Sequence, residues 1–376
     1  MNETVTRHRI TVMINRVLSK KMIEHLKETG IPDLYVAGAR SHVIRESKRV
    51  LGIGIKEKLV DTPLDIISFI VPPELADPIL NQVILWGELT TFGRGSVYCE
   101  EITIPAAHDI FNAPSKILVE PERPAKPLQS LQKICCIVQR GKGTDIARVA
   151  LYSGAGVPVI YFGNGTGVRD KMGILRFTIP AEKEIVVLET TPHNSQSVME
   201  LMIDIGQLSQ PGKGFIFTCT LKQGVADLQV RHGGRRHAAT MEQIIGAIDQ
   251  LRGDTAWRRL AEERTRDPQK SRNFLTGLVE LSLFINAGKG QELVRSAMEA
   301  GVTGATISTG RHISPPDALL ARIGHSRETV NMIIPASILP QVIDSLVEAG
   351  AFSGNCFGQA QVRKIQKAFT YIPHDR

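Results

Sequence analysis

Four short segments place a basic residue between two glycines, a pattern that can bind anions. Gly-Lys-Gly occurs at residues 141–143, 212–214 and 288–290, and Gly-Arg-Gly occurs at residues 93–95. Glycine lets backbone N–H groups turn toward a negative charge, and a Lys or Arg side chain neutralises that charge. The segments at 141–143 and 288–290 lack the spacing of a nucleotide-binding phosphate loop. For these two, a structural turn from strand to helix is the favoured interpretation.

These two segments belong to a longer pattern that occurs three times. Residues 139–163 and 286–310 each contain Gly-Lys-Gly, a helical run, a glycine, a β-branched run and a second glycine. A more diverged copy opens the sequence, and the glycine that ends the helix stands at Gly30, Gly156 and Gly301. These glycines are 126 and 145 residues apart, spacings that suit whole domains rather than a solenoid.

Each copy predicts the element order β-α-β-β-α-β, from β-branched runs and from apolar residues at helical spacing. The first copy predicts strands at 10–16, 34–37, 65–71 and 96–102 and helices at 19–29 and 74–86, with a loop from 38 to about 63. The second predicts strands at 133–139, 157–162, 184–189 and 215–221, a helix from 144 or 145, a glycine-rich loop from 163 to about 182 and a helix at 195–208. The third predicts strands at 281–285, 306–308, 329–334 and 356–364 and helices at 291–300 and 338–349, with a loop from 310 to about 327.

The predicted strands are apolar on consecutive residues, which indicates sheets buried on both faces. Both helices of a β-α-β-β-α-β unit cover one face of its sheet, and three sheets facing one another would cover the other faces. The sequence therefore predicts an α+β protein whose three tandem ferredoxin-like units form a pseudo-trimer in a single, monomeric chain. The expected boundaries are 1–110, 131–225 and 276–376 for the units, 111–130 for a proline-rich linker and 226–275 for a basic, partly helical linker.

The formal net charge of +7 and the pI near 9.2 suit an anionic ligand, nucleic acid or an acidic membrane surface. Much of the surplus lies in residues 231–272, with ten Lys or Arg and six Asp or Glu. A solvated charged helix is the favoured interpretation of this segment. The run RHGGRRH at 231–237 has no aromatic residues for base stacking, so no nucleic-acid partner is expected.

Neither the cysteines nor the histidines form a catalytic or metal-binding pattern. The five cysteines include no C-x-x-C pair, and the apolar surroundings of Cys135 and Cys136 are typical of buried thiols. These features predict a reducing, cytoplasmic location, and no apolar run reaches the roughly 18 residues of a membrane span. Without an activated nucleophile or a metal constellation, the sequence predicts that the protein is not an enzyme.

The second and third units resemble the PII-type signal-transduction family (nitrogen regulatory protein PII and PII-like proteins). The resemblance lies in RGKGTDIARVALYSGAGVPVIYFGNGTG at 140–167, NAGKGQELVRSAMEAGVTGATISTGR at 286–311 and PGKGFIFTCTL at 211–221. It covers about two thirds of the chain and is weakest in the first unit. Members of this family are homotrimers of ferredoxin-like subunits, each with a T-loop between strands two and three, a B-loop before strand four and a C-terminal C-loop.

The resemblance implies that an adenine nucleotide (ATP, ADP or AMP) binds as an effector in the clefts between units, with no cofactor required. In the family, the B-loop wraps the phosphates, and the base of the T-loop and basic residues add contacts. The positions that match the B-loop are Gly212, Lys213 and Gly214; Gly93, Arg94 and Gly95; and Ser353 and Gly354. Those that match the base of the T-loop are Gly163, Gly165, Gly310 and Arg311, and Arg363 matches a C-loop residue. For 93–95 and 212–214, ligand binding and a structural turn both stay open.

The family's nucleotide binders carry a Lys directly after the last B-loop glycine, where this chain has Ser96, Phe215 and Asn355. Two hypotheses follow. In the first, a small anionic effector orders the T-loops, which regulate a protein partner such as a membrane transporter or a metabolic enzyme. In the second, the clefts are degenerate and the protein is a non-catalytic structural adaptor.

Overall fold

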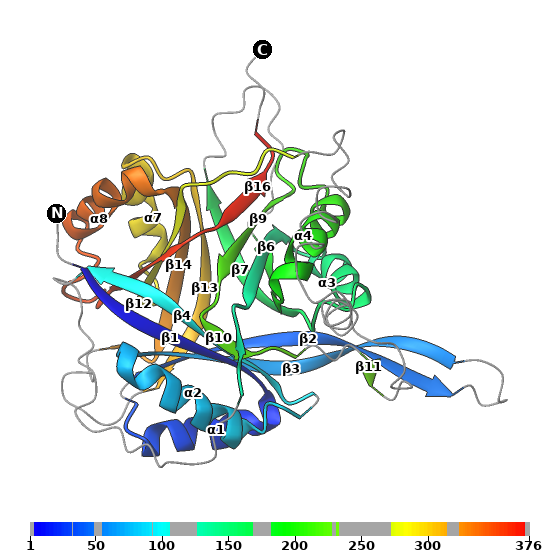
Figure 1. Ribbon diagram of the computed structural model, residues 1–376. Helices are drawn as coiled ribbons and strands as arrows, with labels where there is room; N and C mark the ends of the chain where they lie inside the picture. The colour runs from blue at the N-terminus through cyan, green and yellow to red at the C-terminus, as the bar shows by residue number, and fades with distance from the viewer. Residues whose placement is uncertain are drawn as a thin grey trace, which may run out of the picture.

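Three consecutive segments of the chain have the same element order, β-α-β-β-α-β, in the computed structural model (Figure 1). The structure describes residues 4–31, 33–48, 55–91, 93–105, 126–167, 182–227, 231–232, 272–313 and 323–372. Unit 1 consists of β1 (Thr4–Asn15), α1 (Arg16–Glu28), β2 (Leu34–Lys48), β3 (Ile55–Val71), α2 (Pro73–Gly87) and β4 (Gly95–Pro105). Unit 2 consists of β6 (Gln132–Gln139), α3 (Gly143–Tyr152), β7 (Val159–Gly167), β8 (Glu182–Thr190), α4 (Pro192–Gly206) and β9 (Gly214–Thr220).

Unit 3 has the same elements and one extra helical turn. It consists of β12 (Leu278–Asn286), α7 (Gly290–Glu299), β13 (Gly304–Ile313), β14 (Ser326–Pro335), the 3-10 turn η4 (Ala336–Ile338), α8 (Leu339–Glu348) and β15 (Gln359–Lys364). Among the described residues, four short strands lie outside the units: β5 (Leu128–Gln129), β10 (Gln223–Val225), β11 (Arg231–His232) and β16 (Lys367–Thr370).

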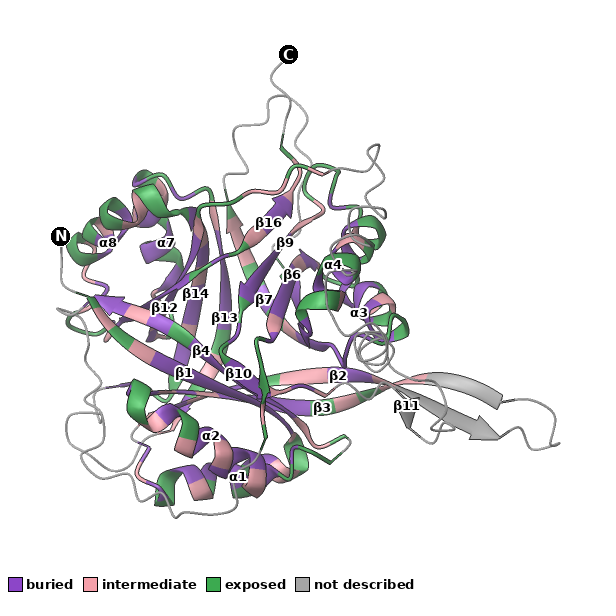
Figure 2. Ribbon diagram, in the orientation of Figure 1, coloured by how far each residue is buried: buried purple, intermediate pink, exposed green. Residues whose placement is uncertain are grey.

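Within each unit the strands lie in the order fourth, first, third, second, and neighbouring strands are antiparallel. This order is β4-β1-β3-β2 in unit 1, β9-β6-β8-β7 in unit 2 and β15-β12-β14-β13 in unit 3. The two helices of each unit turn their apolar stripes to one face of that unit's sheet, which gives each unit a core of its own. In Figure 2, the exposed residues lie mostly on the outward sides of these helices.

The second strands of the three units pair with one another at the centre of the assembly. β2 pairs with β7 and with β13, and β13 also pairs with β7. These three pairings join the sheets of the units into one large, mainly antiparallel sheet. Backbone groups that would otherwise form exposed strand edges are therefore satisfied between units.

The fourth strands are joined by an exchange of short extensions. β10, which follows unit 2, pairs with β4 of unit 1, and β16, which follows unit 3, pairs with β9 of unit 2. The end of β4 in unit 1 pairs with β15 of unit 3, at Thr103 and Val362. Each unit therefore extends the fourth strand of another unit, and the exchange closes in a ring.

A fourth core lies on the helix-free faces of the sheets, where the three units meet. It includes Met13 from unit 1, Phe217 from unit 2 and, after β15, Ile365. In β6, the consecutive residues Ile134 and Cys135 are both buried, Ile134 in the core of unit 2 and Cys135 in this shared core. The strand is therefore buried on both faces, which explains its unbroken apolar sequence.

The prediction of a loop from residue 38 to about 63 is wrong for the described residues. β2 and β3 pair continuously from Tyr35 and Ser68 out to Lys48 and Ile55. The result is a long hairpin that projects from the body of the molecule (Figure 1). A projecting two-stranded hairpin needs no apolar face, so its sequence lacks the alternation from which a strand is predicted.

The second strands of units 2 and 3 are also longer than predicted. β7 continues through the glycines to Gly167, and β13 continues to Ile313. The glycines have a packing reason, because a Cβ at Gly163 would lie 2.8 Å from Cγ2 of Thr306 on β13. A glycine-rich sequence that suggests a loop is here a strand in close contact with another strand.

Several predictions fall on residues outside the described part of the chain. These include most of the proline-rich linker, most of the basic linker and the middle of the loops after β7 and β13. Among the helices of the described residues, none is both long enough and apolar enough to cross a membrane.

Candidate functional site

The register of strand pairing identifies equivalent positions in the three units. The fourth strand begins at Gly95 in unit 1 and at Gly214 in unit 2, and the register gives Gly358 the same position in unit 3. Gly354, the B-loop residue expected from the sequence, lies four residues earlier, in the turn before β15.

The Gly-Lys-Gly turns before α3 and α7 each hold a carboxylate of the same unit. Oε2 of Glu184 accepts hydrogen bonds from the N–H groups of Gly141, at 2.9 Å, and Gly143, at 2.7 Å. Oε2 of Glu328 accepts one from the N–H of Gly290, at 2.7 Å. Negative charge is stabilised at a helix N-terminus, so the turns bind the chain's own carboxylates. This geometry supports the structural interpretation of the two turns over phosphate binding.

A cleft of about 210 Å³ lies between units 1 and 2, and we call it the unit 1–unit 2 cleft. It combines the root of the β2–β3 hairpin, the loop before β4 and the first residues of β7. Its described lining residues are Met13, Asn15, Ser41, Val43, Thr62, Leu64, Gly93, Gly95, Ser96, Val157, Val159 and Asp227. Two of the residues predicted as ligand contacts, Gly93 and Gly95, are among them.

The loop that carries these glycines presents its backbone to the cleft. Gly93 and Gly95 have positive φ angles of 73° and 133°, and a Cβ at Gly95 would lie 2.0 Å from the carbonyl oxygen of Met13. Only glycine fits at position 95. The side chain of Arg94 instead forms an ion pair with Glu88, at 2.8 Å, and is not among the lining residues. Arg94, the residue predicted to contact a ligand, therefore pairs instead with the residue that follows the C-terminal end of α2.

A buried carboxyl group lies behind one lining residue of the cleft, at the boundary between the units. The hydroxyl of Ser96 in unit 1 donates to Oε2 of Glu189 in unit 2, at 3.3 Å. Glu189 is 3% exposed, and burial raises its pKa to about 7. Equivalent positions in the other units hold Ile70 and Ile333. The polar pair is therefore specific to this cleft.

The candidates at the base of the T-loops lie on two other clefts. Gly163 lines a cleft of about 290 Å³ between β7 and β13, and Gly165 pairs with Thr306 on β13. Gly310 and Arg311 line an open groove of about 830 Å³ along α1. The structure thus distributes the predicted residues over several places rather than bringing them into one site.

The loop at residues 212–214 is tied down by neighbouring segments. The side-chain amide of Gln139 donates to the carbonyl of Gly212, at 3.1 Å, and the hydroxyl of Thr370 on β16 donates to the carbonyl of Gly214, at 2.9 Å. Phe215, which follows, packs against the shared core. These contacts give the loop of unit 2, including Lys213, a structural environment that differs from the open cleft beside Gly95.

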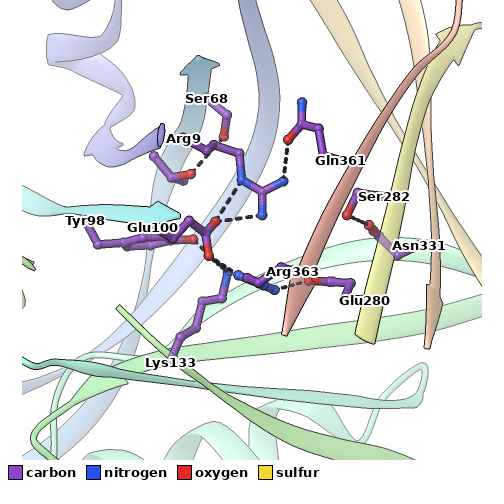
Figure 3. Close-up of polar contacts among 11 residues, drawn as sticks. Arg9, Ser68, Tyr98, Glu100, Lys133, Glu280, Ser282, Asn331, Gln361 and Arg363 are labelled. Atoms are coloured by element: carbon purple, nitrogen blue, oxygen red, sulfur yellow. Dashed lines mark hydrogen bonds and ion pairs between the residues drawn. The ribbon is translucent and has the colours of Figure 1, made fainter. Parts of the chain in front are cut away.

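Arg363 lies in a buried ionic cluster, which we define as Arg9, Glu100, Lys133, Glu280 and Arg363 (Figure 3). Glu100 is at its centre and contacts Arg9 Nη2 at 2.6 Å, Lys133 Nζ at 3.3 Å and the guanidinium of Arg363. Arg363 also pairs with Glu280. The predicted C-loop residue is therefore part of the junction between the units and lies away from the unit 1–unit 2 cleft.

The cluster occupies equivalent positions of the three units. Arg9, Lys133 and Glu280 are equivalent on the first strands and lie opposite Glu100, Cys219 and Arg363 on the fourth strands. Burial raises the pKa of Cys219 to about 11, so its thiol stays neutral at pH 7. The cluster contains three cations and two carboxylates because unit 2 supplies a lysine without an acid.

Sequence reasoning missed the buried acids at both ends of the run EIVVLE, which are Glu184 and Glu189. Their position was a usable signal, because each glutamate directly flanks an apolar strand. A charged residue that is buried at such a position is seldom without a partner. Their partners, however, lie on other elements or on another unit, as Ser96 and the Gly141 turn show.

No family model matches the chain, and no curated protein matches it. Among solved structures, a GlnK–ATP complex from B. subtilis is 14% identical, with a TM-score of 0.22, over 26% of this chain and 84% of that one. A glycopeptide hexose oxidase in complex with teicoplanin is 10% identical, with a TM-score of 0.17, over 86% of this chain and 58% of that one. An anthrone oxidase-like protein is 11% identical, with a TM-score of 0.17, over 62% and 100%. These TM-scores are too low to define a shared fold.

Proposed function

We propose that this chain is a PII-like regulatory protein in which a small effector binds the unit 1–unit 2 cleft and acts on a partner through the β2–β3 hairpin. The observation that carries the proposal is the composition of the cleft wall. The hairpin root, the glycine loop before β4 and the start of unit 2 all line the same space. A ligand there would contact the hairpin and both units at once.

The hairpin root is also tied directly to unit 2. Arg40 on β2 pairs with Glu184 of unit 2, at 2.9 Å, and Ser41 lies opposite Val159 on β7. The same arginine lies 3.4 Å from Asp61 on the other strand of the hairpin. An effector that binds one arrangement of this root more tightly than another would shift the hairpin between them. The hairpin would then present a different surface to a protein partner, such as a membrane transporter or a metabolic enzyme.

The lining favours an adenine nucleotide with few phosphates. Val43, Leu64 and Val157 offer apolar walls for a base, and Ser41 and Thr62 offer hydroxyl groups. The described lining residues include no Lys or Arg to neutralise a triphosphate, and the charged residue among them is an aspartate, Asp227. We therefore place AMP and adenosine ahead of ATP as effectors.

Calorimetric titration with adenosine, AMP and ATP tests this assignment. We expect one saturable site per chain for AMP or adenosine and binding of ATP weaker by about tenfold or more. Thr62→Tyr fills the cleft from the hairpin root and should weaken binding by a similar factor. Thr303→Tyr, at an exposed position of unit 3, is the matched control and should bind as the wild type does.

Hydrogen exchange of the hairpin amides tests the coupling. Bound AMP should slow exchange at the root of β2 and β3 in the wild type and in Thr303→Tyr, and much less in Thr62→Tyr. No binding of any of the three ligands would overturn the effector assignment. Binding that is unaffected by Thr62→Tyr would overturn the choice of cleft.

A second function, that of a structural adaptor, has one observation in its favour. The loop of unit 2 is closed by β16 and followed by the packed ring of Phe215, so the equivalent cleft of that unit has lost its polar wall. If the unit 1–unit 2 cleft also binds no nucleotide, the adaptor hypothesis becomes the better explanation. The projecting hairpin would then be a constitutive docking element.

A further inference from the structure

A second cavity lies between units 1 and 3, separate from the proposed effector cleft. Its volume is about 30 Å³, and its walls come from strands of both units, with Arg9 and Tyr35 on one side and Arg327 and Gln359 on the other. A cavity holds a water molecule once about 10–15 Å³ is open to the water's centre. The cavity therefore has room for a guest that is one or two non-hydrogen atoms wide.

A chain of hydrogen bonds fixes the orientation of the side-chain amide of Gln359, which lines the cavity. Arg9 can only donate, and its Nη1 donates to Oε1 of Gln361, at 2.9 Å (Figure 3). Nε2 of Gln361 then donates to Oε1 of Gln359, at 3.1 Å. This order of donors and acceptors leaves Nε2 of Gln359 as the last donor. That atom is buried and has no hydrogen-bond partner among the described residues.

Gln359 is only 2% exposed, so its unpartnered amide cannot turn to bulk water. A buried donor without an acceptor destabilises the folded state, and a bound water molecule or ion is one physical explanation of such a group. The guest that completes this chain must be a hydrogen-bond acceptor.

The charges around the cavity favour an anion as that acceptor. Arg327 is 3% exposed, and its hydrogen bonds go to neutral oxygens of Asn286, Phe284 and Phe357. Among the described residues it forms no ion pair with a carboxylate. Burial lowers the pKa of Arg327 to about 10, and the nearby charge of Asp33 only partly opposes this shift.

The surrounding carboxylates contact groups other than Arg327. In the neighbouring ionic cluster, Glu100 and Glu280 pair with Arg9, Lys133 and Arg363, and Lys133 also lies opposite the buried Glu189. Asp33, on the wall of the cavity, contacts His312. Arg327 is therefore a largely buried cation that no described carboxylate binds, which is costly unless an anion compensates it.

We propose that the cavity between units 1 and 3 binds one small monovalent anion, of the size of chloride or formate, held by the amide of Gln359 and the field of Arg327. The anion accepts the hydrogen bond of Gln359 and compensates the positive charge of Arg327. It thereby fastens unit 3 to unit 1. The site is independent of effector binding between units 1 and 2.

Anomalous diffraction from crystals of the wild-type protein grown in sodium bromide tests the site directly. We expect one bromide peak within hydrogen-bonding distance of Nε2 of Gln359 and on the side of Arg327. Electron density for water alone at this position, with bromide in excess, would overturn the proposal.

Thermal unfolding in solution gives a second test with a matched pair of variants. Gln359→Glu keeps an oxygen to accept from Gln361 and puts a carboxylate oxygen where the unpartnered amide was. This variant carries its own anion, so its Tm should no longer rise with bromide or formate. Gln210→Glu makes the same charge change at an exposed position of unit 2 and should respond as the wild type does.

Sodium gluconate at equal ionic strength separates specific binding from general salt effects, because gluconate is too large for the cavity. The wild-type Tm should be higher in bromide or formate than in gluconate, with an increase that follows the logarithm of the anion concentration. Bromide and formate distinguish a halide site from a carboxylate site. An equal response in the wild type and Gln359→Glu, or no difference from gluconate in the wild type, would overturn the proposal.

Discussion

The boundary between units 1 and 2 and the boundary between units 2 and 3 place different side chains at the same position. The first has the buried pair Ser96 and Glu189, while the second has Phe215 and Ile333, both packed against the shared core. The apolar pair shows that the fold itself needs no polar group there. A buried carboxyl with a raised pKa weakens folding at neutral pH, so the polar pair is better explained by a use than by stability.

The third boundary, between units 3 and 1, is intermediate. Its equivalent residues are Gln359 and Ile70, and both line the cavity proposed to hold an anion. The equivalent pair of side chains is thus a serine with an acid beside a cleft, an amide with an isoleucine beside a cavity, and two apolar side chains in a closed contact. Substitutions that exchange these side chains measure what each boundary contributes to the free energy of unfolding.

The largest effect is expected where the boundaries converge, in the ionic cluster. Glu100→Gln leaves Arg9, Lys133 and Arg363 buried without their shared counter-charge, and we expect a loss of about 3–5 kcal/mol in the free energy of unfolding. Urea denaturation at pH 7 measures it. Glu101→Gln, at the adjacent exposed position, is the control and should change stability by less than about 0.5 kcal/mol.

The effect of Glu100 also has a defined pH dependence. Burial alone would raise the pKa of Glu100, but Arg363, Arg9 and Lys133 together hold it well below 4.5. A depressed carboxyl pKa stabilises the folded state above the unfolded pKa and loses that contribution as the pH falls below it. The difference between wild type and Glu100→Gln should therefore shrink below pH 4.5. A difference that is constant from pH 7 to pH 3 would contradict this role of the cluster.

The next effect has the opposite sign and converts the first boundary into the second. Glu189→Ile places the residue of units 1 and 3 at this position and should increase stability at pH 8, by at most about 3 kcal/mol for a pKa raised from 4.5 to about 7. A raised carboxyl pKa favours the folded state at low pH and costs stability as the pH rises toward 7. The gain should be much smaller at pH 4. Urea denaturation at the two pH values decides, and an equal gain at both would show that folding does not raise the pKa of Glu189.

The smallest effects are expected at the Gly-Lys-Gly turns before α3 and α7, whose carboxylates differ in the number of their contacts. Glu184 accepts two backbone hydrogen bonds and pairs with Arg40, while Glu328 accepts one from Gly290. Glu184→Gln should cost about 1–2 kcal/mol and Glu328→Gln about half as much. Denaturation of both variants measures the ratio. Equal costs would mean that neither the second backbone hydrogen bond to Glu184 nor its ion pair with Arg40 contributes to stability.

The repeated units could be predicted from the sequence because their signals are local. The glycine caps, the apolar runs and the helical spacing of residues such as Met22 and Leu26 each depend on a few neighbouring positions, and the helices lie close to the predicted ranges. The β2–β3 hairpin could not be predicted in this way, because a strand that projects from a fold is not selected for an apolar face. The same holds for Gly354, since only the register identifies Gly358 as the equivalent of Gly95.

The candidate site was predicted only in part, for a related reason. Gly93 and Gly95 were found because a turn with positive φ restricts its own sequence. Glu189 and the ionic cluster depend on contacts between residues that are far apart in the sequence. Ser96 contacts Glu189, Arg9 contacts Glu100, and the partners in each pair are 91 or more residues apart. No local pattern encodes such pairs, so they follow only from the assembled strands.

The ring of exchanged strands fixes the order in which the protein can fold during its synthesis. Val362 pairs with Thr103 of unit 1 across 259 residues, and β16 completes the edge of β9. Until β15 and β16 leave the ribosome, units 1 and 2 have open strand edges, and closing so long a loop is slow. A nascent or truncated chain is therefore open to capture by a second copy, which can supply its own β15 and β16 to the waiting edges. Strand-exchanged dimers, formed at high expression and absent at low expression, are the misfolded product to look for.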